Sequence, residues 1–303
     1  MDSSQFKQLR GKLYFNHSLA RYTSWRVGGR AECFYRPADL LDLQHFLAQL
    51  PDHEPITWLG LGSNVLIRDG GIAGTVILTL HGLTIIDRLD AVTLRVEAGV
   101  TCAKLAKYCV DAGFEAGAFF AGIPGTVGGA LAMNAGAFGS ETWDQVVLAE
   151  TVDRKGQLYR RVPGEFNIQY RQVDGLGGHY FVAGHFRFPA GDSARAKQQI
   201  QQLLKHRNET QPIGQYSCGS VFRNPPGEYA ARLIEVAGLK GVSMGDAEVS
   251  PKHANFILNK GAACAADIEK LINYVAERVH ERTGIPLVRE VHIIGKIAER
   301  NGP

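Results

Sequence analysis

A short segment near residue 220 combines a thiol, a hydroxyl and an amide, which can act as a nucleophile, a proton donor or a hydrogen-bond partner. Cys218, Ser220 and Asn224 all lie in this segment, beside a glycine. Cys218 with His253 as its base would form a nucleophilic pair. A strand over 218–223 would turn Cys218 and Ser220 to the same side, because side chains alternate along a strand. Spacing alone does not choose between thiol and hydroxyl.

Several isolated charged or titratable residues are of types that bind anions or share protons. They are Arg171, Arg207, the adjacent pair Lys252 and His253, and Glu290. Taken singly, each is more typical of a surface charge or a salt-bridge partner. Glu290 fits that interpretation least, because it lies in an apolar segment.

A glycine turn follows an apolar segment at residues 60–65, which read Gly-Leu-Gly-Ser-Asn-Val. It resembles the start of the dinucleotide fingerprint G-x-G-x-x-G, but Val65 stands where a helix should begin. β-Branched residues there favour a second strand, so we expect strand–turn–strand without the helix N-terminus of a Rossmann site. Backbone N–H groups of such a turn, with Ser63 and Asn64, can bind phosphate. The alternative is a plain glycine turn.

Glycine is concentrated in one part of the chain, since fifteen of the 35 glycines lie between Gly60 and Gly139. Residues 116–140 carry no charge and have the length of a membrane span. Seven glycines and Pro124 would interrupt such a helix, so we expect buried backbone instead. Glycine lets backbone approach a ligand closely, which suits a diphosphate and a flat ring system. A glycine-rich buried turn is the alternative.

Composition excludes several classes of protein. The net charge of +3 is too small to argue for nucleic-acid binding. Five cysteines without a C-x-x-C pair predict neither a disulfide framework nor a metal site. Residues 1–12 lack the apolar core of a secretory signal, so we expect a cytoplasmic protein.

Periodicity predicts a mixture of strands and helices. Strands are expected over 56–61, 75–80, 93–98, 146–152, 157–162, 180–188, 218–223, 255–258 and 285–294. Helices are expected from a Thr101 cap to Gly113, from about Asp192, over 228–237, and from an Asp267 cap to Gly284. The fold class is therefore α+β.

Taken in order, these motifs resemble the MurB family of UDP-N-acetylenolpyruvoylglucosamine reductases, also called UDP-N-acetylmuramate dehydrogenases. The resemblance covers nearly the whole chain, and the ordered combination is specific where each motif alone is weak. The matching segments are YTSWRVGG at 22–29, GLGSN at 60–64, GIPG at 122–125, GSVFRNP at 219–225, AEVSPKHANF at 247–256 and REV at 289–291.

The resemblance implies a two-part FAD-binding module of the vanillyl-alcohol-oxidase type and a C-terminal α+β substrate domain. The expected parts are a first FAD-binding subdomain at 1–80, a second at 81–205 and the substrate domain at 206–290, with 291–303 packing back on the first. The length resembles the shorter subtype of the family, without an additional tyrosine-bearing loop over the substrate.

The implied activity is FAD-mediated, NADPH-dependent reduction of UDP-N-acetylglucosamine enolpyruvate to UDP-N-acetylmuramate. This reaction supplies a peptidoglycan precursor, and so serves cell-wall synthesis, cell shape and division. The implied ligands are FAD, NADPH and the UDP-sugar, with no metal, no nucleic acid and no membrane insertion. A rival hypothesis is an FAD-dependent sugar or alcohol oxidase on the same cofactor module.

The resemblance also implies roles for individual residues. Ser220 is expected to donate the proton, while Arg171 and Glu290 act at the substrate carboxylate. Expected FAD contacts are Gly60, Gly62, Ser63, Asn64, Val65, Gly122, Ile123, Pro124, Gly125, Thr126, Gly128, Gly129 and Asn134. Expected substrate contacts are Arg207, Asn224, Lys252 and His253. The chain departs from the family at Val173, where a small hydroxyl residue is usual.

Overall fold

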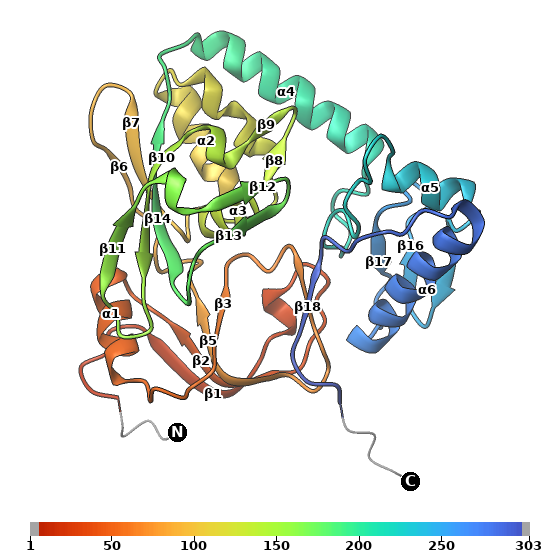
Figure 1. The fold of residues 1–303 in the computed structure, drawn as a ribbon, viewed down its shortest axis with the longest axis horizontal. Coiled ribbons are helices and arrows are strands. Elements are labelled where there is room, and N and C mark those ends of the chain that lie inside the picture. Colours follow the sequence, from red (N-terminus) through yellow and green to blue (C-terminus); the bar gives the residue numbers. More distant parts are fainter. Residues whose placement is uncertain (1–5, 299–303) are drawn as a thin grey trace. The chain divides into compact units, whose positions relative to one another are not determined.

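The computed structural model describes residues 6–298, and the chain divides into two compact units that alternate along the sequence (Figure 1). The first unit contains residues up to 14, 33–61 and 74–206. The second contains residues 15–32, 62–73 and 207 onward. Each unit is therefore built from segments that are distant in the sequence.

The first unit begins with a four-stranded sheet in the order β1-β2-β5-β3, in which β3 and β5 are parallel. Its elements are β1 (Lys12–Ser18), β2 (Arg30–Arg36), α1 (Leu40–Gln49), β3 (Ile56–Leu59) and β5 (Ile72–Leu78). Strands β1, β2 and β5 each cross the sequence boundary between the units. The Asp39 carboxylate caps α1 by accepting the Asp42 N–H.

The rest of the first unit is a five-stranded antiparallel sheet with helices packed on it (Figure 1). The strand order is β11 (Leu158–Arg161), β10 (Val146–Val152), β14 (Tyr180–Arg187), β7 (Thr93–Glu97) and β6 (Ile86–Arg88). The helices are α2 (Cys102–Asp111), α3 (Val127–Met133) and α4 (Ser193–Thr210), and α4 crosses the sequence boundary at residue 206. The 3-10 turns are at Glu115–Gly122, Thr142–Asp144 and Pro163–Glu165. Two hairpins complete it: β8 (Gly136–Ala137) with β9 (Ser140–Glu141), and β12 (Asn167–Gln169) with β13 (Gln172–Asp174).

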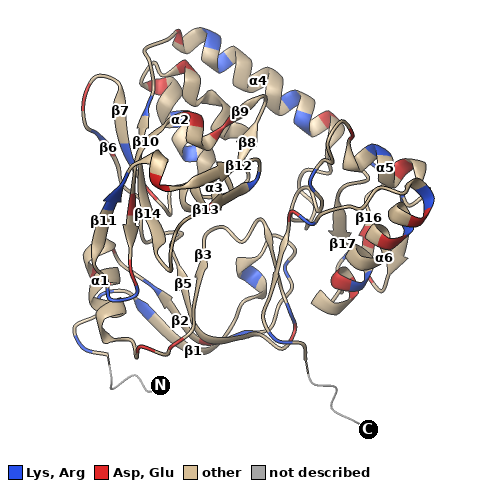
Figure 2. Ribbon diagram, viewed as in Figure 1, with Lys and Arg blue, Asp and Glu red and all other residues tan. Residues whose placement is uncertain are grey.

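The second unit packs two helices and two small sheets around an apolar cluster that includes Trp25 and Phe222. Its strands are β4 (Val65–Ile67) parallel to β18 (His292–Ile294), and β15 (Ser243–Met244), β16 (Ala247–Val249) and β17 (Ile257–Asn259). Its helices are α5 (Ala230–Val236) and α6 (Ala265–Thr283), with a 3-10 turn at Ala20–Tyr22. Figure 2 shows charged residues of both signs along α4 and α6, as expected for exposed helix faces.

Several sequence predictions are confirmed. The turn at 60–64 lies between strands β3 and β4, as Val65 indicated. Thr101 caps α2 by accepting the Lys104 N–H, and Gly284 ends α6 in a left-handed conformation. The expectation of buried backbone over 116–140 holds only in part: the segment forms short helices, turns and strand β8, and residues such as Pro124, Gly129 and Phe138 are exposed.

In the described part of the chain, no helix has the length and apolar character to cross a membrane.

Three predictions about secondary structure are wrong. Residues 218–223 form no regular strand, because Gly219 has φ +83° and breaks the extended run. The strand expected over 285–294 is only β18, preceded by an isolated bridge at Arg289. Helix α6 begins earlier than expected: Cys264 is the N-cap, and Asp267 accepts the Cys264 N–H from inside the helix (3.1 Å).

Candidate functional site

A buried hydroxyl between two glycines marks the first part of the site. Thr126 is 1% exposed, and its Oγ1 has no hydrogen-bond partner among the described residues. A Cβ on Gly60 would collide with that oxygen, whereas a Cβ on Gly129 would meet only the same oxygen at 3.9 Å. Buried polar groups are normally bonded, so the unpaired hydroxyl beside open glycine backbone fits a bound polar group. The geometry at Gly60, Thr126 and Gly129 is therefore compatible with the FAD contacts that the resemblance implies.

Other glycines of the same segment are explained by close packing. The Gly128 N–H donates to the Ala98 carbonyl (2.8 Å), and a Cβ on Gly128 would lie 2.9 Å from the Ala98 Cβ. A Cβ on Gly122 would collide with the Phe138 ring. The Gly125 carbonyl accepts the Cys102 N–H (2.9 Å). The side-chain contacts explain Gly122 and Gly128 without a ligand, and the expected FAD contacts of Gly122, Gly125 and Gly128 remain predictions.

Two neighbours in this segment differ in exposure. Ile123 is buried in the apolar cluster of the five-stranded sheet, whereas Pro124 is exposed. Asn134 is 2% exposed, and its side chain bonds to protein groups at both ends. Ile123 therefore has a packing role and Asn134 a hydrogen-bonding role, and their contacts with FAD remain predictions.

The turn at 62–65 belongs to the second unit. Gly62 has φ +67°, and its carbonyl accepts the Ser24 N–H (2.9 Å). The Asn64 Nδ2 donates to the Glu290 carbonyl (3.1 Å), and the Asn64 carbonyl accepts the His292 N–H (3.1 Å). Ser63 and Val65 are half-buried. Asn64 thus fastens the glycine turn to the segment that carries Glu290.

Arg171 lies at the turn between β12 and β13 in the first unit, with φ +58°. This left-handed conformation is unfavourable for a residue with a side chain, so tertiary contacts must stabilise it. Its Nη1 donates to the Asn134 carbonyl (3.3 Å) and its Nη2 to the Gly136 carbonyl (3.0 Å). Val173 packs against the apolar cluster. The guanidinium is thus supported by backbone carbonyls, and not through a hydroxyl at position 173.

Ser220 and Glu290 lie on two segments of the second unit that are paired at Val221. The Glu290 N–H donates to the Val221 carbonyl (2.8 Å), and the Val221 N–H donates to the Asn255 carbonyl (2.9 Å). The Asn255 side chain bonds both the N–H and the carbonyl of Phe222 (3.0 and 2.8 Å). Asn255 therefore fixes the irregular backbone that follows Ser220.

Cys218 is not suited to nucleophilic catalysis. It is 5% exposed, and burial raises the pKa of its thiol well above the usual value, with the nearby charge of Glu290 acting in the same direction. A protonated, buried thiol is a poor nucleophile. The pairing of Cys218 with His253 that the sequence left open is therefore not supported.

Arg207 is a half-buried cation near the end of α4. Its Nε donates to Gln211 Oε1 (3.0 Å), and no carboxylate among the described residues lies within ion-pair distance. Burial lowers the pKa of its guanidinium, which nevertheless stays charged at neutral pH. A half-buried cation without a carboxylate partner is suited to bind an anionic ligand.

Lys252, His253 and Asn224 are held by local hydrogen bonds. The Ser250 hydroxyl accepts the N–H groups of Lys252 and His253 (3.2 Å each), and the Lys252 ammonium donates to the Asn208 carbonyl. Burial lowers the pKa of His253, and its Nδ1 is buried without a partner. His253 is therefore a neutral group at pH 7. The Asn224 Oδ1 accepts the Ala230 N–H (3.1 Å) at the start of α5.

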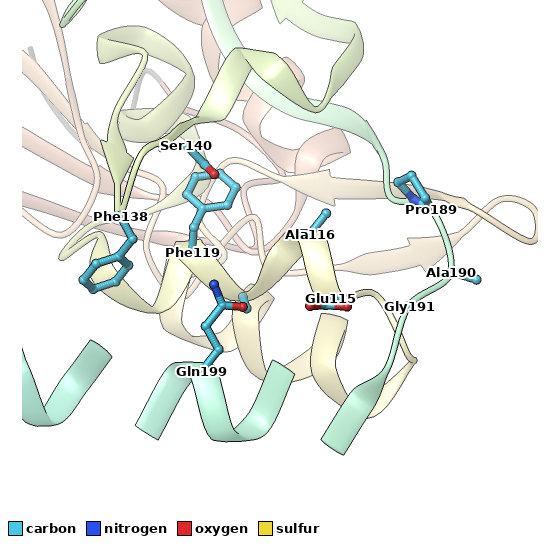
Figure 3. Close-up of a pocket in the computed structure, with 10 residues that line it drawn as sticks. Glu115, Ala116, Phe119, Phe138, Ser140, Pro189, Ala190, Gly191 and Gln199 are labelled. Atoms are coloured by element: carbon cyan, nitrogen blue, oxygen red, sulfur yellow. The ribbon is translucent and has the colours of Figure 1, made fainter. Parts of the chain in front are cut away.

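A cavity of about 340 Å³ lies in the first unit, and its lining residue Phe138 packs against Gly122 (Figure 3). It is lined by Phe119, Phe138, Glu115 and Gln199 among others, and none of its lining residues is a predicted site residue. Phe138 has φ +57° at the tip of the β8–β9 hairpin. The cavity contains one carboxylate, Glu115, which pairs with Arg195 (3.2 Å).

The sequence prediction missed two residues that contact the site segments and one that anchors the core beneath one of them. Asn255 fixes the segment after Ser220, and Glu141 lies beside Arg171 (3.8 Å). Trp25 donates from its indole to the Ile257 carbonyl (2.7 Å) in the core of the second unit. Trp25 and Asn255 fall inside motifs that carried the resemblance. Glu141 follows the glycine-rich segment and has no signal of its own.

Family models match two parts of the chain. Residues 211–294 match the C-terminal domain of UDP-N-acetylenolpyruvoylglucosamine reductase. Residues 31–161 match an FAD-binding domain. The second match includes the glycine turn and the Thr126 segment described above.

Similar proteins cover almost the full chain. A UDP-N-acetylenolpyruvoylglucosamine reductase from Coxiella burnetii is 64% identical, over 98% of this chain and 100% of the relative. One from Legionella pneumophila is 54% identical, over 97% and 96%. The crystal structure of the reductase (MurB) from Thermus caldophilus has a TM-score of 0.80 at 30% identity, covering 94% of this chain and 99% of that one. A 6-hydroxy-D-nicotine oxidase from Arthrobacter nicotinovorans shares the fold, with a TM-score of 0.54 at 14% identity.

Proposed function

From the premise that the chain belongs to the UDP-N-acetylenolpyruvoylglucosamine reductase family and is an FAD-containing oxidoreductase, we propose that NADPH is its reductant and UDP-N-acetylglucosamine enolpyruvate its substrate. The product is UDP-N-acetylmuramate. We further propose that the reaction takes place in the cytoplasm, where NADPH and UDP-sugars are made.

The observation that carries the substrate class is Arg207. This half-buried guanidinium lacks a carboxylate partner among the described residues, and a diphosphate would supply the missing charge. Lys252 and the neutral His253 provide further donors in the same unit. In this proposal, Arg207 and Lys252 bind the diphosphate, while Asn224 and His253 contact the sugar nucleotide.

FAD, when bound, would supply the redox chemistry, namely the transfer of a hydride equivalent from NADPH to the vinyl carbon distal to the substrate carboxylate. Negative charge then develops toward the carboxylate. Arg171, fixed by the carbonyls of Asn134 and Gly136, stabilises that charge, and Glu290 assists at the same carboxylate. Ser220 donates the proton to the adjacent carbon. A serine hydroxyl is a weak acid, so this role requires support from neighbouring groups; the Asn255 network fixes the backbone that follows Ser220.

Thr126, Gly60 and Gly129 would hold part of FAD through the unpaired hydroxyl and the open backbone. Asn64 and Ser63 would present the glycine turn to its phosphates. The retention of FAD on purification is therefore expected. Oxygen consumption without NADPH oxidation would instead favour the rival oxidase.

Two half-reactions test the proposal. Ser220→Ala should leave flavin reduction by NADPH nearly unchanged, because Ser220 acts only on the sugar nucleotide. Flavin reoxidation by the enolpyruvyl substrate should slow by roughly 100-fold, as for a lost general acid. Stopped-flow absorbance of the flavin measures both steps.

Controls for this test come from the same segment. Ser217→Ala removes a hydroxyl three residues away, and Cys218→Ala removes the buried thiol; both should leave reoxidation nearly unchanged. The proton-donor assignment fails if Cys218→Ala slows reoxidation more than Ser220→Ala does. The reductase assignment fails if the enolpyruvyl substrate does not increase NADPH consumption.

A further inference from the structure

The position of the Arg171 guanidinium depends on two uncharged backbone carbonyl groups. These carbonyls must themselves be fixed by other contacts. The guanidinium donates to the carbonyls of Asn134 and Gly136, at 3.3 and 3.0 Å. The Arg171 backbone adopts a left-handed conformation in a two-residue turn, which an arginine does not favour on its own. The aromatic ring of Tyr170 lies 4.8 Å from the guanidinium carbon. Whatever orders the two carbonyls therefore determines where the cation lies.

Asn134 is the residue that fixes these carbonyls. It follows helix α3 in a left-handed conformation, with φ +42°, and is 2% exposed. Its Oδ1 accepts the Trp143 N–H (3.1 Å), and its Nδ2 donates to the Gln169 carbonyl (3.3 Å). Gln169 is the last residue of β12, two before Arg171. One buried amide thus joins the end of α3 to the Arg171 hairpin.

Glu141 makes the shortest of the bonds to Asn134. Its Oε2 accepts the Asn134 Nδ2 at 2.7 Å, and a charged acceptor strengthens such a bond. The backbone of Glu141 pairs with Gly136, whose carbonyl holds Arg171. Glu141 is therefore connected to both carbonyls that support the guanidinium.

Glu141 could act on Arg171 in two ways, as a counter-ion or as a hydrogen-bond acceptor for Asn134. The Arg171 Nη1 lies 3.8 Å from Glu141 Oε1, near the outer limit of an ion pair. The Glu141 side chain is 34% exposed, so solvent screens its charge. The bond to Asn134 is short and links Glu141 to a buried amide. The distances favour the acceptor role.

We propose that Glu141 is a positioning residue for Arg171, acting through its hydrogen bond to Asn134. This inference rests on the proposed function, in which Arg171 binds the substrate carboxylate. In this proposal, the β8–β9 hairpin and the β12–β13 turn together determine the position of the Arg171 guanidinium. The neutral glutamine side chain should preserve the function, because it keeps an acceptor oxygen at the same place.

Two variants separate the acceptor role from the charge. Glu141→Ala should slow flavin reoxidation by the enolpyruvyl substrate roughly 10- to 100-fold, the size expected for a catalytic group displaced by about 1 Å. Glu141→Gln should stay within about threefold of the wild type. Both should reduce their flavin with NADPH at the wild-type rate. Glu165→Gln, which alters an exposed ion pair with Arg161, is the matched control and should change neither step.

Product binding gives a readout that does not depend on turnover. The Kd of UDP-N-acetylmuramate, measured by calorimetry, should rise for Glu141→Ala and stay near the wild-type value for Glu141→Gln. Equal damage by both substitutions would assign the effect to charge and overturn the acceptor role. Equal slowing of both half-reactions, or no slowing by Glu141→Ala, would also overturn the proposal.

A double variant distinguishes this inference from the function on which it rests. If Glu141 acts through Arg171, Glu141→Ala should add nothing to the reoxidation defect of Arg171→Ala. Additive defects would show that Glu141 acts elsewhere, with the role of Arg171 intact. If Arg171→Ala itself leaves reoxidation at the wild-type rate, the assignment of Arg171 in the proposed function fails instead.

Discussion

The Thr126 segment of the first unit and the Ser220 segment of the second unit both have irregular backbone, which is stabilised in a different way in each. Around Thr126, small residues let chains approach: Gly128 packs on Ala98 and Gly60 leaves room for a hydroxyl. Around Ser220, asparagine side chains supply the missing ladder bonds, with Asn255 bonding both backbone groups of Phe222. Glycine provides space in one region, whereas asparagine provides hydrogen bonds in the other. The first region should therefore be sensitive to added volume and the second to lost polar groups.

The largest effect is expected at Asn255, because its amide serves two buried backbone groups. Asn255→Ala would leave the N–H and carbonyl of Phe222 without their partners in the protein core. Each unsatisfied buried group costs about 1–3 kcal/mol, so the free energy of unfolding should fall by about 3 kcal/mol. Urea unfolding followed by circular dichroism measures this change.

A half-conservative variant tests the cause of that loss. Asn255→Asp keeps the acceptor for the Phe222 N–H but sets a buried carboxylate against the Phe222 carbonyl, so at neutral pH it should be at least as unstable as Asn255→Ala and should regain stability at a pH that protonates the carboxyl. If Asn255→Ala is as stable as the wild type, asparagine bonding does not support the Ser220 segment, and the contrast between the two regions is lost.

This contrast also explains which features the sequence could predict. The turn at 60–64 was predictable because its strands are adjacent in the sequence and Val65 disfavours a helix. The segment 218–223 was not, because its partners are distant: Phe222 bridges Arg289, and Val221 bonds to Asn255. Local periodicity contains no information about such partners. Gly219 then interrupts the alternation that would have placed Cys218 and Ser220 on one side.

The candidate site shows the same division. Glycine content indicated that the backbone near Thr126 is closely approached, and the unpaired Thr126 hydroxyl agrees with this. That Gly122 packs against Phe138 was not predictable, because the contact depends on a hairpin formed later in the chain. Glu141 carries no local signal at all, since its importance lies in a bond to Asn134 that only the folded chain makes.

Ion pairs also stabilise the five-stranded sheet of the first unit, and their contribution should be lost in acid. Glu150 bonds to Arg95 (2.7 Å) and to His185 (2.8 Å) across neighbouring strands. Burial raises the pKa of Glu150, but the bonds to His185 and Arg95 outweigh burial and lower it to about 2. Because the folded pKa is depressed, the stabilisation is complete above the unfolded value of 4.5 and is lost as pH falls toward 2.

The loss between pH 5 and pH 2 should amount to about 2 kcal/mol of the free energy of unfolding. Glu150→Gln should flatten this part of the pH dependence, as measured by denaturant unfolding at a series of pH values. Glu281→Gln, which removes an exposed ion pair with Arg278 in the second unit, should leave the dependence unchanged. An unaltered slope in Glu150→Gln would contradict the assignment.

The smallest effect is expected at Gly60, where an added side chain would press only on the side chain of Thr126. A Cβ on Gly60 would collide with Thr126 Oγ1, so Gly60→Ala should turn the hydroxyl away from the position that suits FAD. We expect about tenfold weaker FAD binding, or ~1.4 kcal/mol, measured by fluorescence titration of the apoprotein. Gly164→Ala is the matched control, because a Cβ there meets nothing within 4 Å and the residue has no left-handed φ. If both alanine variants bind FAD as the wild type does, space at Gly60 is not what the cofactor requires, and the unpaired hydroxyl of Thr126 needs another explanation.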